Sequence, residues 1–231
     1  MRILAVADVH SPRFLQNFID SLKDLKSPDL FLFAGDMINR GTVEEFPRLI
    51  DIVNDHMGHD FPIVACYGNE EYGEIRDHLV ALSNDRVQFL DEISTILEFD
   101  GKKIGIVGTQ GSLDRPTTWQ RRNLPNIRHV FTRRATRAFN LLSKLKDKVD
   151  HSILLMHYSP CLETCEGEDI RSFSWLGSRK FYKVIKDAQP DLVIHGHVHN
   201  SVVHEARLDS SLIRNVSLPA VRSVTDLTLW E

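Results

Sequence analysis

Short runs of apolar residues alternate with amphipathic segments along most of this chain. Five runs have the length and composition of buried strands, at residues 2–7, 30–34, 62–67, 152–156 and 192–194. Apolar residues recur at helical spacing in other segments, which predicts helices over residues 14–25, 43–57, 74–82, 132–148 and 178–188. Thr42 precedes the second of these helices and is a candidate N-cap.

A hairpin and a strand-rich C-terminus complete the pattern. Residues 93–99 and 103–107 flank Asp100-Gly101, a turn pair typical of two-residue β-hairpins. Strand-like runs follow at 202–206, 212–216 and 224–230, whereas residues 113–128 show no periodicity and are expected to form a long loop. Continuous apolar strands separated by helices indicate an α/β core whose sheet faces are covered. We therefore expect a single domain over residues 1–231, in which two sheets pack together and helices lie outside them.

Composition places the chain among ordinary globular proteins. Of its 231 residues, 42% are hydrophobic and 26% are charged, and the formal net charge of −4 argues against a nucleic-acid binder as a whole. No apolar run is long enough to span a bilayer, and the N-terminus lacks the features of a signal peptide, so we expect no membrane partner.

Cys66, Cys161 and Cys165 cannot all pair within the chain and are expected to be reduced thiols, which predicts a cytoplasmic protein. Cys161 and Cys165 would suit half of a metal site, but no matching second pair exists.

Side chains that bind metals follow five of the predicted strands, at the point where each strand ends. They are Asp8, His10, Asp36, Asn69, His157, His197 and His199. Each motif alone has an ordinary explanation, such as a turn, a helix cap or a core histidine. Because ligands bind at the carboxyl ends of strands in open α/β sheets, five such motifs in succession indicate one shared site.

This set of ligands predicts a dinuclear metal centre. Carboxylate oxygens together with imidazoles favour manganese, with iron, zinc, cobalt or nickel as alternatives. Seven ligands are too many for one tetrahedral ion and suit two adjacent ions, with Asp36 from a central strand as the bridge. Two ions about 3.5–4 Å apart can share a hydroxide and hold both oxygens of an in-line displacement. The pattern therefore predicts hydrolysis of a phosphate ester.

The five motifs together resemble those of the calcineurin-like metallophosphoesterase superfamily. They are present in order as Asp8-Val9-His10, Gly35-Asp36-Met37-Ile38-Asn39-Arg40-Gly41, Gly68-Asn69-Glu70-Glu71, the isolated His157, and Gly196-His197-Val198-His199. The resemblance implies one metal held by Asp8, His10, Asp36 and His199, and a second held by Asp36, Asn69, His157 and His197. It also implies two mixed β-sheets in a sandwich flanked by helices. His195 is not a family ligand and is interpreted as a strand-end histidine near the site.

Glu70 departs from the family pattern, which has histidine at this position. The family histidine protonates the leaving group or steadies the phosphate, and Glu70 could act as a catalytic acid only with a raised pKa, to which the neighbouring Glu71 could contribute. The alternative is a solvated loop residue, with no protein acid in use. Relatives without this histidine tend to prefer phosphodiesters, so we expect a phosphodiesterase.

Arg40 and Asn69 are candidate substrate-binding residues. A guanidinium beyond the bridging Asp36 can hold phosphate oxygens in a bidentate manner, and the matching arginine contacts phosphate in some relatives. The alternative for Arg40 is a surface residue on the loop before a helix.

Two charged segments allow further interpretations. A basic stretch could bind nucleic acid, although a solvated helix face is favoured; it comprises Arg121, Arg122, Arg128, Arg133, Arg134 and Arg137. Residues 163–169 are acidic and are expected to form an exposed loop. The rival function is a binding scaffold of the same fold with weak or no catalysis, and a nuclease would need more chain than is present.

Overall fold

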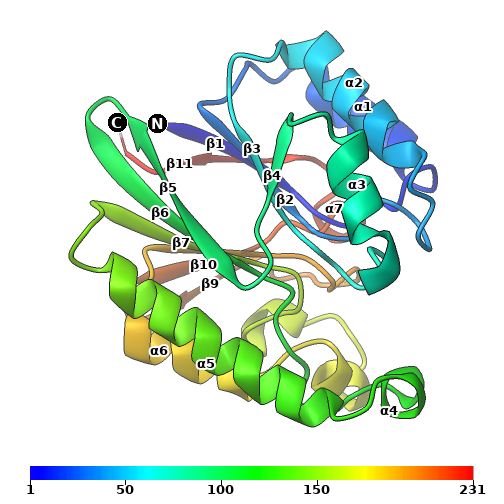
Figure 1. Ribbon diagram of the computed structural model, residues 1–231, viewed down its shortest axis with the longest axis vertical. Helices are drawn as coiled ribbons and strands as arrows, with labels where there is room; N and C mark the ends of the chain where they lie inside the picture. Colours follow the sequence, from blue (N-terminus) through cyan, green and yellow to red (C-terminus); the bar gives the residue numbers. More distant parts are fainter. Residues whose placement is uncertain (231) are drawn as a thin grey trace.

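Two mixed β-sheets pack face to face in the computed structural model, which describes residues 1–230, and helices cover both outer faces (Figure 1). One sheet has the order β11 (Thr225–Thr228), β1 (Arg2–Val6), β2 (Leu30–Ala34), β3 (Ile63–Cys66), β4 (Val87–Phe89). The other has the order β5 (Ile93–Phe99), β6 (Lys102–Thr109), β7 (His151–Met156), β8 (Leu192–His195), β10 (Ser211–Asn215), β9 (Glu205–Leu208). The predicted two-sheet α/β fold is confirmed.

The central strands of each sheet run parallel. β1 to β4 are parallel neighbours in the first sheet, as are β6, β7, β8 and β10 in the second. Antiparallel strands lie at the edges, where β11 pairs with β1, β5 with β6, and β9 with β10. The parallel strands therefore deliver their carboxyl ends to a common edge of each sheet.

Alternate side chains of each central strand enter different apolar cores. In β1, Ile3 and Ala5 pack between the sheets, whereas Leu4 and Val6 pack against the helices outside. In β7, Ile153 also lies between the sheets. Burial on both faces explains why these strands are continuous apolar runs rather than alternating ones.

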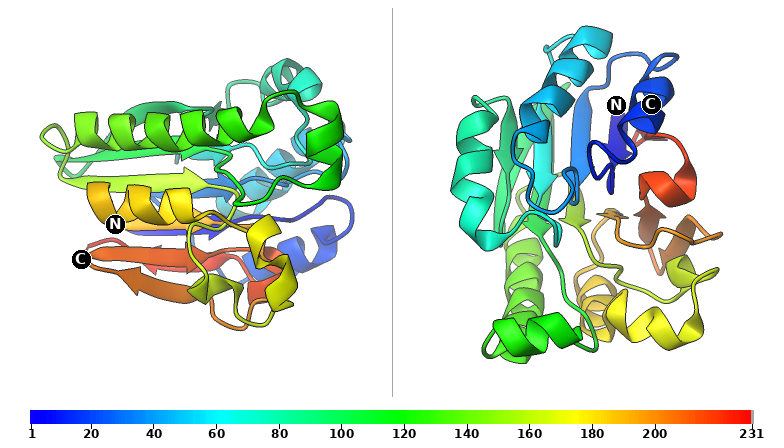
Figure 2. Two further views of the ribbon diagram at one scale, coloured as in Figure 1. Left: turned by 90° about the horizontal axis from the view of Figure 1, so that it is seen from below. Right: turned by 90° about the vertical axis from the view of Figure 1, so that its right-hand side faces the viewer.

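The helices form the outer layers (Figure 2). The first sheet is covered by α1 (Leu15–Leu22), α2 (Glu45–Met57) and α3 (Arg76–Leu82), and the second by α5 (Ile127–Leu145) and α6 (Arg179–Ala188). Short helices complete the described chain: η1 (Gly73–Ile75), α4 (Thr118–Asn123), η2 (Glu163–Cys165), η3 (Ile170–Trp175) and α7 (Leu218–Val221). None of the helices in the described part of the chain combines the length and apolar character that a membrane span requires.

The segment predicted as a long loop, residues 113–128, is partly helical. Thr117 caps α4 by accepting a hydrogen bond from the Gln120 backbone, and the Gln120 side chain accepts one from Thr117 in return. This capping box stabilises a helix too short to show periodicity. Helix α5 also begins at Ile127, five residues before its predicted start, because Ile127 and Phe131 extend its buried stripe past the intervening charged residues.

Two other sequence predictions are wrong in detail. The strand predicted at 202–206 is β9 at Glu205–Leu208, because Val202 lies in a loop, 74% exposed, with its N–H bonded to the Glu166 carbonyl. Thr42 does not cap α2, since its hydroxyl donates to the Asn39 carbonyl and the helix begins at Glu45. The hairpin turn is confirmed, with positive φ at both Asp100 and Gly101.

Candidate metal centre

Loops that leave the carboxyl ends of five strands bring the predicted ligands together. Asp8 follows β1, Asp36 follows β2, Asn69 follows β3, His157 follows β7, and His197 follows β8. Two groups of potential ligand atoms result, each with its atoms within 4.8 Å of one another: Asp8, His10 and His199 in the first group, and Asp36, His157 and His197 in the second. Strands of both sheets contribute, so the site depends on how the sheets pack.

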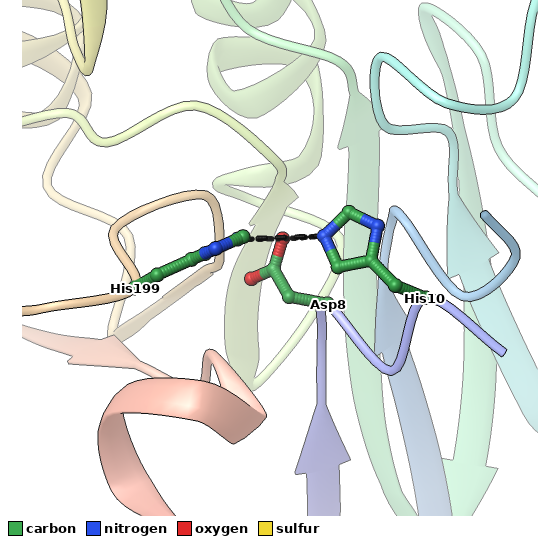
Figure 3. Close-up of side chains that lie close together, drawn as sticks. All are labelled: Asp8, His10 and His199. Atoms are coloured by element: carbon green, nitrogen blue, oxygen red, sulfur yellow. Dashed lines mark hydrogen bonds and ion pairs between the residues drawn. The ribbon is translucent and has the colours of Figure 1, made fainter. Parts of the chain in front are cut away.

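The first group surrounds one oxygen of Asp8 (Figure 3). Asp8 Oδ1 lies 3.1 Å from His199 Nε2 and 3.7 Å from His10 Nε2, and the two imidazole nitrogens are 3.5 Å apart. Asp8 Oδ1 is buried and accepts no hydrogen bond from residues 1–230. The second oxygen, Oδ2, accepts the His197 backbone N–H at 2.8 Å. A buried carboxylate oxygen with no donor, flanked by two imidazoles, fits a divalent cation.

The second group is centred on Asp36. Asp36 Oδ2 lies 3.3 Å from His157 Nε2, and Asn69 Oδ1 lies 3.2 Å from the same nitrogen. The same Asp36 oxygen is 3.9 Å from His10 Nε2, which belongs to the first group. Asp36 is therefore placed within reach of both groups, as a bridging carboxylate must be.

Backbone carbonyls determine which nitrogen of two histidines is free to bind a metal. His157 Nδ1 lies 2.9 Å from the Ala34 carbonyl and His197 Nε2 lies 3.3 Å from the Trp175 carbonyl. A carbonyl can only accept, so each of these nitrogens carries the proton. This arrangement leaves Nε2 of His157 and Nδ1 of His197 for a metal, and it fixes the orientation of both rings.

Left-handed backbone conformations recur at the site. Asp8, His10, Asp36 and His197 have φ angles of 59°, 43°, 52° and 70°. Each such conformation is unfavourable for a non-glycine residue by on the order of 1–3 kcal/mol, and strain of this kind clusters at functional sites. The loops also pack very closely, since a Cβ on Gly68 would overlap Asp36 Oδ1.

Glu71 supports the loops that carry Asp36 and Asn69. Its buried carboxylate accepts hydrogen bonds from the backbone N–H groups of Asp36 (2.8 Å), Met37 (2.8 Å), Ile38 (3.3 Å) and Gly68 (2.7 Å). Burial and the nearby Asp36 charge raise the pKa of Glu71 to about 7, while the backbone bonds oppose that rise. The sequence suggested that Glu71 acts on Glu70, but the structure directs it to these backbone amides.

The side chain of Glu70 binds the backbone of Arg40. The Glu70 N–H donates to Asp36 Oδ1 at 2.7 Å, and Glu70 Oε2 accepts the Arg40 N–H at 2.6 Å. Glu70 is half-buried and tied to the loop after β2, so it is not a freely solvated residue. Arg40 is exposed, with φ of 47°.

The ionisable groups at the site are strongly coupled. Burial lowers the pKa of His157, but the charge of Asp36 and the contact with it outweigh burial and raise that pKa to about 10. Burial, helped by the charge on His157, lowers the pKa of His197 to about 4. In the absence of metal, a protonated His157 therefore pairs with Asp36, and a bound cation would replace that proton.

His195 and the cysteines lie outside both groups. His195 Nδ1 donates to the Gly196 carbonyl at 2.9 Å, and its Nε2 lies 2.9 Å from the Thr164 hydroxyl. Burial lowers the pKa of His195 to about 4, which agrees with a neutral strand-end histidine. Cys66, Cys161 and Cys165 are free and buried.

The arginines of the basic stretch do not form one exposed surface. The Arg134 guanidinium turns inward, 2.7 Å from Gln110 Oε1 and 3.8 Å from Glu92 Oε1, and Arg137 donates to the Glu92 carbonyl. Arg121, Arg122, Arg128 and Arg133 are exposed. Among the acidic residues expected in a loop, Glu163 lies in η2, and Glu168 accepts two hydrogen bonds from Asn200.

Sequence reasoning missed three groups that support the site: the Trp175 carbonyl, the Gln110 side chain and the carboxylate of Glu71 as a backbone acceptor. Glu71 is part of the motif Gly68-Asn69-Glu70-Glu71, so its sequence position indicated that it lies near the site. Trp175 contributes only a backbone atom, and Gln110 contacts Gly68 across 42 residues of sequence, so neither gave a local signal.

The overall architecture is similar to that of several solved structures. Phosphopantetheinyl hydrolase (PptH) from Mycobacterium tuberculosis aligns with a TM-score of 0.65 at 16% identity, over 95% of this chain and 90% of that one. TT1561 of Thermus thermophilus aligns with a TM-score of 0.64 at 17% identity, over 99% of both chains. A putative 5'-nucleotidase from Staphylococcus aureus aligns with a TM-score of 0.56 at 14% identity, over 93% of this chain and 48% of that one. At sequence identities this low, the structural similarity shows a shared fold and nothing more.

Sequence comparison gives a more specific result. No curated protein sequence matches this chain significantly. The family model for calcineurin-like phosphoesterases matches residues 1–201, a span that includes every predicted metal ligand. The chain therefore belongs to the calcineurin-like phosphoesterase family, a family of metal-dependent hydrolases.

Proposed function

We propose that this protein hydrolyses phosphodiesters with two divalent ions, which we assign as manganese. The observation that carries the proposal is the position of Asp36, whose Oδ2 is 3.3 Å from a histidine of one ligand group and 3.9 Å from a histidine of the other. A single carboxylate shared by two groups of imidazoles and oxygens is what a dinuclear centre requires.

The ligand set divides between two ions. Asp8, His10, Asp36 and His199 would hold the first ion, and Asp36, Asn69, His157 and His197 would hold the second. Two ions bound there supply electrophilic activation of the phosphoryl group and a water molecule that ionises near neutral pH. The carbonyls of Ala34 and Trp175 hold the protons of His157 Nδ1 and His197 Nε2, which leaves the other nitrogen of each ring for the second ion.

Substrate binding is assigned to Arg40, with Asn69 contributing at the second ion. Arg40 is exposed, in the middle of the same loop that carries Asp36, and its N–H is bonded to the Glu70 carboxylate. A guanidinium on this loop could bind phosphate oxygens in a bidentate manner.

Glu70 supports the assignment of diesters as substrates. Its carboxylate is held by the Arg40 N–H at 2.6 Å and lies next to Asn69, where the family histidine would stand. A negative charge there repels a phosphate monoester dianion more strongly than a diester monoanion. In this role Glu70 selects substrates by charge, and the leaving group departs without a protein acid.

A scaffold without catalysis is the rival function. It would be favoured by missing ligands, but the seven ligand residues are present and both groups are assembled. The buried free thiols fit the cytoplasmic location that we propose.

The proposal is tested with two chromogenic substrates. Metal-depleted protein is loaded with each divalent metal in turn and assayed with bis-p-nitrophenyl phosphate and with p-nitrophenyl phosphate. We expect hydrolysis of the diester to be highest with manganese and to exceed hydrolysis of the monoester. Absence of metal-stimulated hydrolysis of either compound would support the scaffold instead.

A further inference from the structure

A cluster of the buried Gln110 and the partly buried Arg134 and Arg76 lies behind the loop that carries Asn69. The Gln110 side-chain amide donates to the Gly68 carbonyl at 3.0 Å, and Gly68 immediately precedes Asn69. Arg76 Nε donates to the Glu71 carbonyl at 3.2 Å, two residues after Asn69. The backbone on both sides of Asn69 is therefore held by this cluster.

The two arginines in turn fix Gln110. Gln110 Oε1 accepts a hydrogen bond from Arg134 Nη2 at 2.7 Å and from Arg76 Nη2 at 3.4 Å. Arg134 also donates to the Gly111 carbonyl at 3.2 Å, so its planar guanidinium contacts both the Gln110 side chain and the backbone of the following residue. Gln110 is 8% exposed, and its amide has a fixed orientation because the oxygen accepts from two arginines while the nitrogen donates to the Gly68 carbonyl.

Carboxylates compensate the charge of the cluster. Arg76 pairs with Asp91 at 2.8 Å, and Arg134 Nε lies 3.8 Å from Glu92 Oε1. Glu92 also accepts a hydrogen bond from the Thr109 hydroxyl at 2.6 Å. The guanidiniums are therefore paired and partly buried, and they act as a fixed support rather than as a free anion site.

We propose that Gln110, held by Arg134 and Arg76, is a positioning residue that sets the geometry of Asn69 at the second metal ion. The inference rests on the proposed dinuclear function. In that function Asn69 is a ligand of the second ion and not of the first. A displaced Asn69 therefore weakens binding of the second ion and leaves the first site intact. Residues that support metal ligands typically contribute about 10–100-fold to metal affinity.

A purely electrostatic role and a positioning role of Arg134 predict opposite changes in metal affinity when Arg134 is replaced. Removing a cation near two dications strengthens their binding through Coulomb's law, whereas releasing Gln110 weakens the second ion. Arg137 provides a matched control, because it lies on the same helix and donates to the Glu92 carbonyl but makes no hydrogen bond to Gln110 among residues 1–230.

The experiment is a manganese titration of the metal-depleted full chain by calorimetry and electron paramagnetic resonance. Asn69→Ala is the reference for loss of the second ion. We expect Gln110→Met and Arg134→Met to weaken the second ion about 10-fold or more and the first ion less than about two-fold. Arg137→Met should leave both affinities unchanged.

Several results would overturn the inference. They are unchanged second-site affinity in Gln110→Met, tighter binding in Arg134→Met, or equal weakening of both ions in step with a lower apo melting temperature. If Gln110→Met does not fold, Arg134→Lys decides, since lysine keeps the charge but cannot bridge Gln110 and Gly111, and unchanged affinity would then reject the inference. Wild-type protein that binds fewer than two ions would reject the proposed function itself, and this inference with it.

Discussion

The carboxylate of Glu71 accepts the backbone N–H of Asp36 at 2.8 Å, directly beneath the residue assigned to bridge two metal ions. The same carboxylate binds the N–H groups of Met37, Ile38 and Gly68, so one side chain joins the loops after β2 and β3. Asp36 is thereby held with φ of 52°, a conformation that an aspartate rarely adopts without support.

Replacing Glu71 is expected to destabilise the fold. Glu71→Ala leaves buried backbone donors without an acceptor, each at a cost of about 1–3 kcal/mol, so the loss in unfolding free energy should reach several kcal/mol. Urea denaturation of the metal-free protein measures it. Glu74→Ala, an exposed glutamate in the neighbouring short helix, is the control. Equal stabilities for the two variants would show that Glu71 does not support the loops.

Arg40→Ala is expected to impair catalysis without affecting metal binding. Loss of a hydrogen bond to a charged phosphate costs about 1.5–3 kcal/mol, which corresponds to a decrease of roughly 10- to 100-fold in kcat/KM. Steady-state kinetics and metal analysis measure the two effects separately. Arg48→Ala, on α2 with its side chain 57% exposed, is the control. Wild-type kinetics in Arg40→Ala would make Arg40 an ordinary surface residue.

Glu70→His is expected to raise monoesterase activity relative to diesterase activity. The substitution removes a negative charge near the site and supplies a group that titrates near neutral pH. Glu70→Gln separates the two effects, because glutamine keeps an acceptor for the Arg40 N–H but has neither charge nor acidity. A ratio unchanged in both variants, with metal content intact, would remove the physical basis for diester preference.

Metal binding is expected to release protons at neutral pH. The neighbouring Asp36 raises the pKa of His157 to about 10 against the effect of burial, so His157 is protonated in the metal-free protein near neutral pH. A metal needs the free lone pair and must displace that proton, so affinity should rise with pH up to about 10. Calorimetry in buffers of different ionisation enthalpy counts the protons. A binding enthalpy independent of the buffer would contradict the paired state of His157 and Asp36.

Much of this architecture could be predicted from the sequence because strong local patterns coincide with tertiary burial. The strands β2 and β3 are apolar throughout, and β1 and β7 are apolar after their first one or two residues, since both faces of these strands are covered. The ligand motifs follow directly after these strands. Short elements such as α4 could not be predicted, because a capping box between Thr117 and Gln120 stabilises them rather than periodicity. Val202 and Val203 resembled a strand but lie in a loop.

The support around the site was harder to predict than the ligands. Arg134 stands in a run of basic residues that resembles a solvated face, and only the packing of α5 on the second sheet directs it toward Gln110. Glu71 follows Glu70 in sequence, yet the two carboxylates bind different backbone groups, Asp36 and Arg40 respectively. Such long-range hydrogen bonds depend on the relative placement of loops, which no local pattern records.

The most direct test of the central claim is the number and coupling of the metal ions bound by wild-type protein and by Asp36→Asn. We predict that wild-type chain saturated with manganese binds two ions that give an exchange-coupled electron paramagnetic resonance spectrum. In Asp36→Asn the shared carboxylate is lost, so the coupling should disappear, both affinities should fall and phosphodiester hydrolysis should be nearly abolished. Fewer than two ions per wild-type chain at saturation, or an uncoupled spectrum from two ions, would contradict the dinuclear centre.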